Sequence, residues 1–199
     1  MTSLDAALRG ISAELARARV PFALVGGLAV SVRTEPRFTR DADLAVAVAT
    51  DGEAELLIYR LRARGYGIEA IIEQEAVGRL ATARLVLSSE PRVPVVDLLF
   101  ASSGIESEIV TSAEPVDLLP QLRMGVARTG HLIALKVLSR DDVRRPQDLV
   151  DLRALLRVAS PTEIARARHA LSLIASRGYH RGRDLASDMD RLCAPGERP

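Results

Sequence analysis

The chain has 199 residues, of which 48% are apolar and 27% charged, and its formal net charge is +1. This size and balance suit one globular domain with at most a small appendage, and the charge excludes a global basic field that would draw the chain onto nucleic acid. The single cysteine, Cys193, excludes an internal disulfide, and the longest nearly uncharged stretch, residues 20–32, is too short to span a bilayer. We therefore expect a cytoplasmic protein that makes no membrane contact.

The first half of the chain alternates between helical and strand patterns. Apolar residues recur at helical spacing from Leu4 to Leu15 and predict an amphipathic helix over residues 3–19. The elements predicted next, in chain order, are a strand at 22–25, a helix at 28–33, a strand at 41–49, a helix at 53–64, and strands at 68–73, 79–87 and 93–100. Residues 34–40 are expected to form a loop, and residues 88–92 a hairpin loop between the last two strands.

From about residue 116 the pattern becomes helical. The helices predicted there lie at 116–122, 130–140, 146–158, 161–177 and 183–192. A mixed α/β half followed by a helical half indicates an α+β fold with a mixed β-sheet flanked by helices, rather than a parallel doubly wound sheet. We divide the chain into a core of residues 1–128 and a helical C-terminal region of residues 129–199.

Two aspartates separated by one residue open the strand predicted at 41–49. Residues i and i+2 of a strand point to the same face, so Asp41 and Asp43 project side by side. Like charges this close repel unless a cation lies between them, and Mg²⁺ prefers carboxylate oxygens. Because residues 44–48 continue as an apolar strand, the pair predicts a metal site at the mouth of a rigid sheet.

An adjacent glycine pair, Gly26 and Gly27, joins the apolar strand at 22–25 to the next predicted helix. Glycine lets the backbone approach a ligand closely, and the free N–H groups at a helix start can bind an anion such as a phosphate. A tight strand-to-helix turn without a ligand is the alternative.

Four further charged residues lie in or beside apolar segments. Asp97 interrupts an apolar run, so it either faces solvent at a strand end or lies near a cation as a third metal ligand. Lys136, in a helix that is apolar almost all round, either extends to the surface or presents its charge to a triphosphate. Asp148 and Asp151 begin the next helix, where the helix dipole alone can explain them and where Asp151 can pair with nearby arginines.

Together these motifs resemble the nucleotidyltransferase superfamily that includes DNA polymerase β, whose pattern is an apolar residue, a Gly-Gly or Gly-Ser pair, a spacer and Asp-x-Asp. Val25-Gly26-Gly27-Leu28-Ala29, with the segment Arg-Phe-Thr-Arg-Asp-Ala-Asp-Leu at 37–44, is more specifically similar to the AbiEii and MenT-type toxin nucleotidyltransferases. Leu135-Lys136 and the segment Arg-Pro-Gln-Asp-Leu-Val-Asp-Leu at 145–152 match the later motifs of that family. The resemblance covers about residues 20–158; family members are often longer at the helical end.

The resemblance implies a nucleotidyltransferase fold for residues 1–128, completed by Lys136 and Asp148 from the helical region. It implies a nucleoside triphosphate (NTP) as substrate and Mg²⁺, or Mn²⁺, as the metal. The implied metal ligands are Asp41, Asp43 and Asp97. The implied nucleotide-binding residues are Gly26, Gly27, Thr39, Arg40 and Lys136, with Arg33 as a further phosphate contact. Asp148 would orient Lys136 or the nucleotide sugar, and Asp97 would assist deprotonation of the acceptor hydroxyl.

The acceptor stays open among several classes. The resemblance favours the 3′ end of a tRNA or another RNA, as for the toxin of a toxin–antitoxin pair with an antitoxin protein as its partner, and arginines near the motifs support RNA weakly. A small molecule such as an aminoglycoside or lincosamide would need an acidic pocket, for which Glu73, Glu75, Asp141 and Asp142 are available. A protein hydroxyl is a third acceptor, and a non-catalytic binding module is the alternative outside enzymes. His131, His169 and His180 lack metal-ligand spacing and receive no catalytic role.

Overall fold

A mixed β-sheet flanked by helices forms the centre of the protein. The computed structural model describes residues 3–36, 39, 41–87, 94–141 and 146–194. The strands are β1 (Phe22–Val25), β2 (Ala42–Val46), β3 (Tyr66–Gln74), β4 (Arg79–Leu87), β5 (Val96–Leu99), β6 (Glu114–Leu119) and β7 (Leu122–Val126). The helices are α1 (Ser3–Ala18), α2 (Gly26–Arg33), α3 (Asp51–Ala63), α4 (Glu106–Ser112), α5 (Thr129–Ser139), α6 (Pro146–Val158), α7 (Pro161–Ser176) and α8 (Leu185–Cys193).

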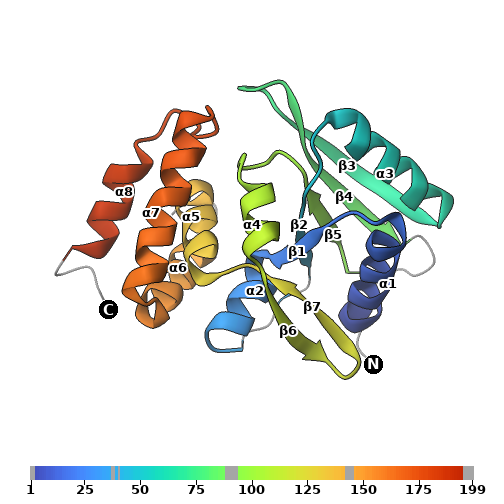
Figure 1. Cartoon of the computed structure of the whole chain (residues 1–199), viewed down its shortest axis with the longest axis horizontal. Coiled ribbons are helices and arrows are strands. Elements are labelled where there is room, and N and C mark those ends of the chain that lie inside the picture. Colours follow the sequence, from blue (N-terminus) through green and yellow to red (C-terminus); the bar gives the residue numbers. More distant parts are fainter. Residues whose placement is uncertain (1–2, 37–38, 40, 88–93, 142–145, 195–199) are drawn as a thin grey trace.

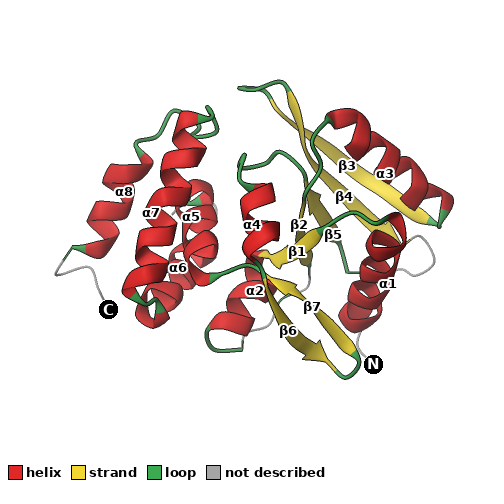
Figure 2. Ribbon diagram, viewed as in Figure 1, coloured by secondary structure: helices red, strands yellow, loops and turns green. Residues whose placement is uncertain are grey.

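Within these residues the sheet has seven strands in the order β3-β4-β5-β2-β1-β7-β6. The β2–β5 and β1–β7 pairs are parallel and the remaining pairs are antiparallel, so the sheet is mixed. Helices α5 to α8 gather on one side of the molecule, while α1 and α3 lie at the opposite side (Figures 1 and 2). The predicted α+β class with a mixed sheet is confirmed, whereas the division at residue 128 stays a prediction.

The helices on both sides of the molecule are held by close packing, and local sequence features explain this packing. Leu8, Ile11 and Leu15 lie on the apolar face of α1 and are buried, as the helical spacing predicted. Gly130 in α5 faces α7, where an added Cβ would lie 2.4 Å from the Glu163 carbonyl oxygen. The missing side chain therefore lets α5 and α7 approach closely, which fixes the helix that carries Lys136.

One prediction in the middle of the chain is wrong, and one helix there was not predicted. Residues 116–122 do not form a helix: they belong to the β6–β7 hairpin, in which Gln121 has φ +61° at the turn. Burial alternates along β6, and Pro115 is tolerated because β6 is an edge strand. The short helix α4 was not predicted at all.

Other boundaries differ only at their ends. Helix α2 begins at Gly26 rather than at residue 28, β2 is shorter than the predicted 41–49, and β5 is shorter than 93–100. The predicted hairpin loop at 88–92 lies outside the described residues. In the described parts of the chain, no helix is both long and apolar enough to cross a membrane.

Candidate active site

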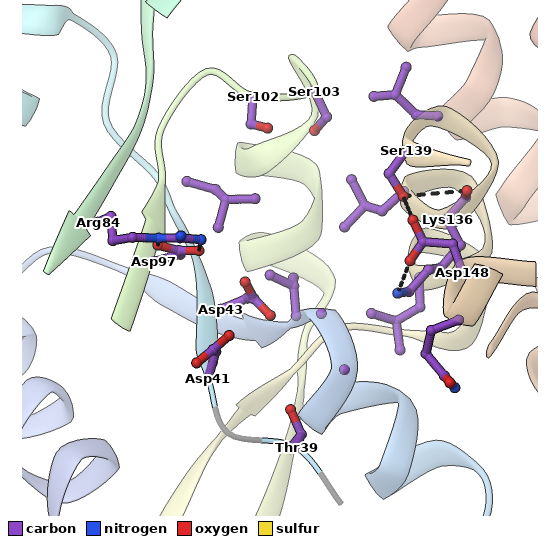
Figure 3. Close-up of a pocket in the computed structure, with 18 of the residues that line it drawn as sticks. Thr39, Asp41, Asp43, Arg84, Asp97, Ser102, Ser103, Lys136, Ser139 and Asp148 are labelled. Atoms are coloured by element: carbon purple, nitrogen blue, oxygen red, sulfur yellow. Dashed lines mark hydrogen bonds and ion pairs between the residues drawn. The ribbon is translucent and has the colours of Figure 1, made fainter. Parts of the chain in front are cut away.

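A row of charged side chains crosses three neighbouring strands. Asp43 on β2 pairs in register with Asp97 on β5, and Asp97 pairs with Arg84 on β4. Directly opposed residues in a sheet point to the same face, so register alone brings these three side chains together. All three line a cavity of about 510 Å³ that also reaches α5 and α6 (Figure 3).

The glycine pair lies at the end of the strand next to this row. Gly26 directly follows β1, has φ +64°, and would place a Cβ only 1.9 Å from Asp43 Oδ2. A side chain at this position would therefore displace the Asp43 carboxylate, so the motif needs glycine here for a steric reason. The Gly27 N–H donates a hydrogen bond to Asp43 and lowers its pKa. One of the two glycines predicted to contact phosphate thus contacts an aspartate.

Asp43 is buried next to other negative charges. Burial, followed by the neighbouring charges of Asp97 and Asp41, raises the pKa of Asp43 to about 6, against lowering contributions from Lys136 and Gly27. A bound divalent cation would relieve this crowding of negative charge. The donor set, carboxylates on adjacent strands, also has the oxygen chemistry that Mg²⁺ and Mn²⁺ prefer.

The three carboxylates nevertheless do not form a ready-made cage. Among the described residues, no group of three or more His, Cys, Asp or Glu side chains is placed to hold a metal ion as it stands. Figure 3 shows Asp41 and Asp43 side by side, whereas Asp97 lies against the Arg84 guanidinium. Asp41 and Asp43 therefore fit a metal site directly, and Asp97 fits it only if its contact with Arg84 changes.

The opposite wall of the cavity carries a buried ion-pair cluster. Lys136 Nζ on α5 lies 2.6 Å from Asp148 Oδ1 and 2.8 Å from Asp151 Oδ2, both on α6. Ser139 Oγ donates to Asp148 Oδ2 at 3.0 Å, and Gln147 Nε2 donates to Asp151 Oδ1 at 3.0 Å. Lys136 therefore neither extends to the surface nor stands alone as a phosphate ligand, because two carboxylates already hold its ammonium group.

The three remaining predicted residues differ in their position relative to the cavity. Thr39 lines the cavity, while Arg40 lies outside the described residues. Arg33 donates to the carbonyl oxygens of Val126 and Ala127 and pairs with Glu114, so it fixes α2 to the sheet and does not line the cavity.

Sequence reasoning did not assign roles to several residues that line the cavity. Ser102, Ser103 and Arg181 are among them, and Arg84 was considered only as one of several arginines that could contact RNA. Glu106 accepts hydrogen bonds from the backbone N–H groups of Ser102 and Ser103, which shapes the loop after β5. For Arg84 a signal was available, because a lone charge inside the apolar run of β4 needs a partner.

A glycine junction beside two aspartates on a mixed sheet is the arrangement that the resemblance to nucleotidyltransferases predicts. An antigenic nucleotidyltransferase-like protein from Paracoccidioides brasiliensis has a similar structure, with TM-score 0.54 and 17% identity over 94% of this chain and 92% of that one. The antibiotic-resistance factor ANT(2″)-Ia is also similar, with TM-score 0.55 and 16% identity over 89% of this chain and 94% of that one. At these identities the likeness establishes the fold.

The family is established by sequence. The profile of the family described as "Nucleotidyl transferase AbiEii toxin, Type IV TA system" matches residues 7–196. The chain therefore belongs to the AbiEii nucleotidyltransferase toxin family, and the predictions of family, fold class and enzyme class are confirmed. A comparison with curated proteins gave no significant sequence match.

Proposed function

We propose that the protein moves a nucleoside monophosphate from an NTP to the 3′-terminal hydroxyl of an RNA, a tRNA in particular, with release of pyrophosphate, as the toxin of a toxin–antitoxin system. The observation that carries this proposal is the meeting of Asp41, Asp43 and the Gly26–Gly27 junction in one cavity. We expect this reaction in the cytoplasm, with an antitoxin protein as the partner that limits it.

The strand side of the cavity supplies the metal and phosphate chemistry. Asp41 and Asp43 would hold Mg²⁺ or Mn²⁺, with Asp97 as a further ligand from the adjacent strand. The bound metal would neutralise charge that develops on the transferred phosphate. The N-terminus of α2 offers backbone N–H groups to the triphosphate, and the Thr39 hydroxyl can donate to it from the cavity wall.

The helix side supplies a fixed positive charge. The Lys136 ammonium lowers the pKa of Asp43, so it favours the ionised carboxylate that a metal requires. Asp148 and Asp151 hold Lys136 in place, which makes them positioning residues in this mechanism. Lys136 would act on the phosphates by direct contact, because at longer range the two paired carboxylates offset its charge.

An RNA acceptor has the better support among the acceptors considered. The family is a toxin family, and Arg181 on the cavity wall carries a guanidinium group that can contact the phosphates of an RNA. The likeness to ANT(2″)-Ia concerns the fold alone. Glu73, Glu75 and Asp141, considered for an acidic drug pocket, do not line the cavity, and Asp142 lies outside the described residues.

A label-transfer assay tests the proposal. The protein is incubated with Mg²⁺, each α-³²P-labelled NTP in turn, and either total tRNA or an aminoglycoside as acceptor. Asp43→Asn is the test variant, and Asp117→Asn is the matched control because Asp117 is exposed and lies outside the cavity. We expect labelled tRNA from the wild type and the control only. Label on an aminoglycoside and none on tRNA would overturn the RNA acceptor, and full activity of Asp43→Asn would overturn the carboxylate mechanism.

A further inference from the structure

Asp97 has both of its oxygens engaged by one arginine. Arg84 Nε donates to Asp97 Oδ1 at 2.9 Å, and Arg84 Nη2 donates to Asp97 Oδ2 at 2.8 Å. This is the bidentate geometry that a guanidinium and a carboxylate adopt when they match as two parallel hydrogen bonds. The residue that the metal site needs as its third carboxylate is thus held by a cation of the protein itself.

The sheet builds this pair, and only one partner is free to leave. Arg84 and Asp97 are opposed in the β4–β5 register, so their backbones are fixed relative to each other. The Asp97 side chain is 11% exposed, whereas that of Arg84 is 42% exposed. The long arginine can turn toward the cavity while the short, enclosed carboxylate stays in place.

Metal at Asp43 and Asp97 would compete with this guanidinium. Asp43 is the next member of the row, so a divalent ion between the two aspartates would face the positive charge of Arg84 at close range. Repulsion between two nearby positive charges weakens metal binding in a partly buried site much more than it does in water. Metal affinity at this site is therefore limited as long as Arg84 stays on Asp97.

A nucleoside triphosphate offers Arg84 another partner. Guanidinium groups bind phosphate oxygens with the same bidentate geometry they use for carboxylates. Arg84 lines the same cavity as Gly26 and Gly27, where the proposed function places the triphosphate. We infer that Arg84 is an exchangeable counter-ion, which occupies Asp97 in the free enzyme and transfers to the triphosphate when nucleotide and metal bind. This inference rests on the metal and nucleotide sites of the proposed function.

A purely structural ion pair is the competing explanation, and the same strand provides its control. Arg79 on β4 donates through Nε to Asp51 Oδ1 at 2.7 Å but lines no part of the site cavity. Arg79→Gln thus removes a comparable cross-element pair without touching Asp97. Arg84→Lys keeps the positive charge and removes the bidentate geometry.

The first measurement is direct binding of Mn²⁺ without nucleotide, by isothermal titration calorimetry and electron paramagnetic resonance. Removing the competing cation should tighten Mn²⁺ binding by Arg84→Gln roughly tenfold relative to the wild type. Arg79→Gln should bind Mn²⁺ like the wild type. At saturating Mn²⁺, Arg84→Gln should bind non-hydrolysable analogues of the NTPs more weakly. A general structural defect would weaken the binding of both Mn²⁺ and the NTP analogue. Tighter Mn²⁺ binding together with weaker binding of the analogue is therefore specific to the exchange.

Thermal unfolding provides a second readout if Arg84→Gln is unstable. Mn²⁺ alone should raise the melting temperature of Arg84→Gln more than that of the wild type, because the ion replaces the lost partner of Asp97. Arg84→Lys should show the same trend at smaller size. One outcome would overturn only the role of Arg84. In that outcome Arg84→Gln binds Mn²⁺ with the affinity of the wild type, while Mn²⁺ and nucleotide still strengthen each other's binding to the wild type. Absence of Mn²⁺ binding by the wild type even with nucleotide would overturn the metal site and the proposed function with it.

Discussion

The two walls of the cavity use ion pairs in different ways. On the strand side, Arg84 covers Asp97 from an exposed position, and the pair borders the predicted metal ligands. On the helix side, Lys136, Asp148 and Asp151 are almost completely enclosed, with exposed side-chain fractions of 12%, 4% and 1%. A pair whose cation is partly solvated contributes less to stability and can exchange partners, whereas a buried cluster fixes the elements that carry it. We therefore assign the exchange of ion partners to the strand wall and the positioning of Lys136 to the helix wall.

The largest expected effect is on activity, at the strand wall. Asp43→Asn should lower turnover on the order of a thousandfold, because it removes a central carboxylate ligand of the metal. The same change should leave the melting temperature equal or higher at neutral pH, since burial and the charges of Asp97 and Asp41 raise the pKa of Asp43 to about 6. Steady-state kinetics and calorimetric unfolding of one preparation test both parts. A loss of activity accompanied by unfolding would contradict this assignment.

The next effect is on stability, at the helix wall. Lys136→Met should lower the free energy of unfolding by about 3 kcal/mol, because it leaves two buried carboxylates without their shared cation. Arg84→Gln should lower it by about 1 kcal/mol or less, since the guanidinium is partly solvated. Chemical denaturation of the two variants measures the difference. Equal losses would show that the walls do not differ as proposed.

A pH effect is expected where α5 meets α4. Burial, with a smaller contribution from Arg166, lowers the pKa of His131 to about 4. The unfolded chain then binds this proton more readily than the folded one, so stability is complete above about pH 6.5 and declines as the pH falls toward 4. His131 should reduce stability at pH 5 by about 2 kcal/mol relative to pH 7.

The raised pKa of Asp43 acts in the opposite direction and is common to the wild type and His131 variants. The comparison is therefore between the pH slopes of the wild type and His131→Gln in urea unfolding. The variant should show a flatter profile between pH 5 and 7. Parallel profiles would exclude His131 as the source of acid sensitivity.

The smallest effect sharpens the description of the helix wall. Ser139 Oγ donates to Asp148 Oδ2 at 3.0 Å, so Ser139→Ala should lower the free energy of unfolding by about 1 kcal/mol. Turnover should fall only slightly, because Lys136 keeps both carboxylate partners. A large loss of activity without a loss of stability would instead place Ser139 in contact with substrate.

The strands and helices that the sequence predicted correctly have strong local periodicity. Helix α1 and strands β1 and β4 lie where their apolar spacing placed them. The protein family indicated by the Gly-Gly and Asp-x-Asp motifs was also recognisable without coordinates. The β6–β7 hairpin was mistaken for a helix because Leu118, Leu119 and Leu122 also fit helical spacing. The strand form of this segment is stabilised by the pairing of β7 with β1, whose residues are distant from β7 in sequence.

The sequence alone indicated the class of chemistry through the resemblance of its Gly-Gly and Asp-x-Asp motifs to the nucleotidyltransferases, and the family match confirms that class. It could not determine the partners of those side chains. Arg84 meets Asp97 through the register of β4 and β5, and Lys136 meets Asp151 through the packing of α5 on α6. Ion pairs form between whichever charges the fold brings within a few ångströms, and that choice depends on tertiary contacts rather than on local pattern. Tertiary contacts thus set which charges in the site are paired, and the proposed exchange of Arg84 follows from that pairing.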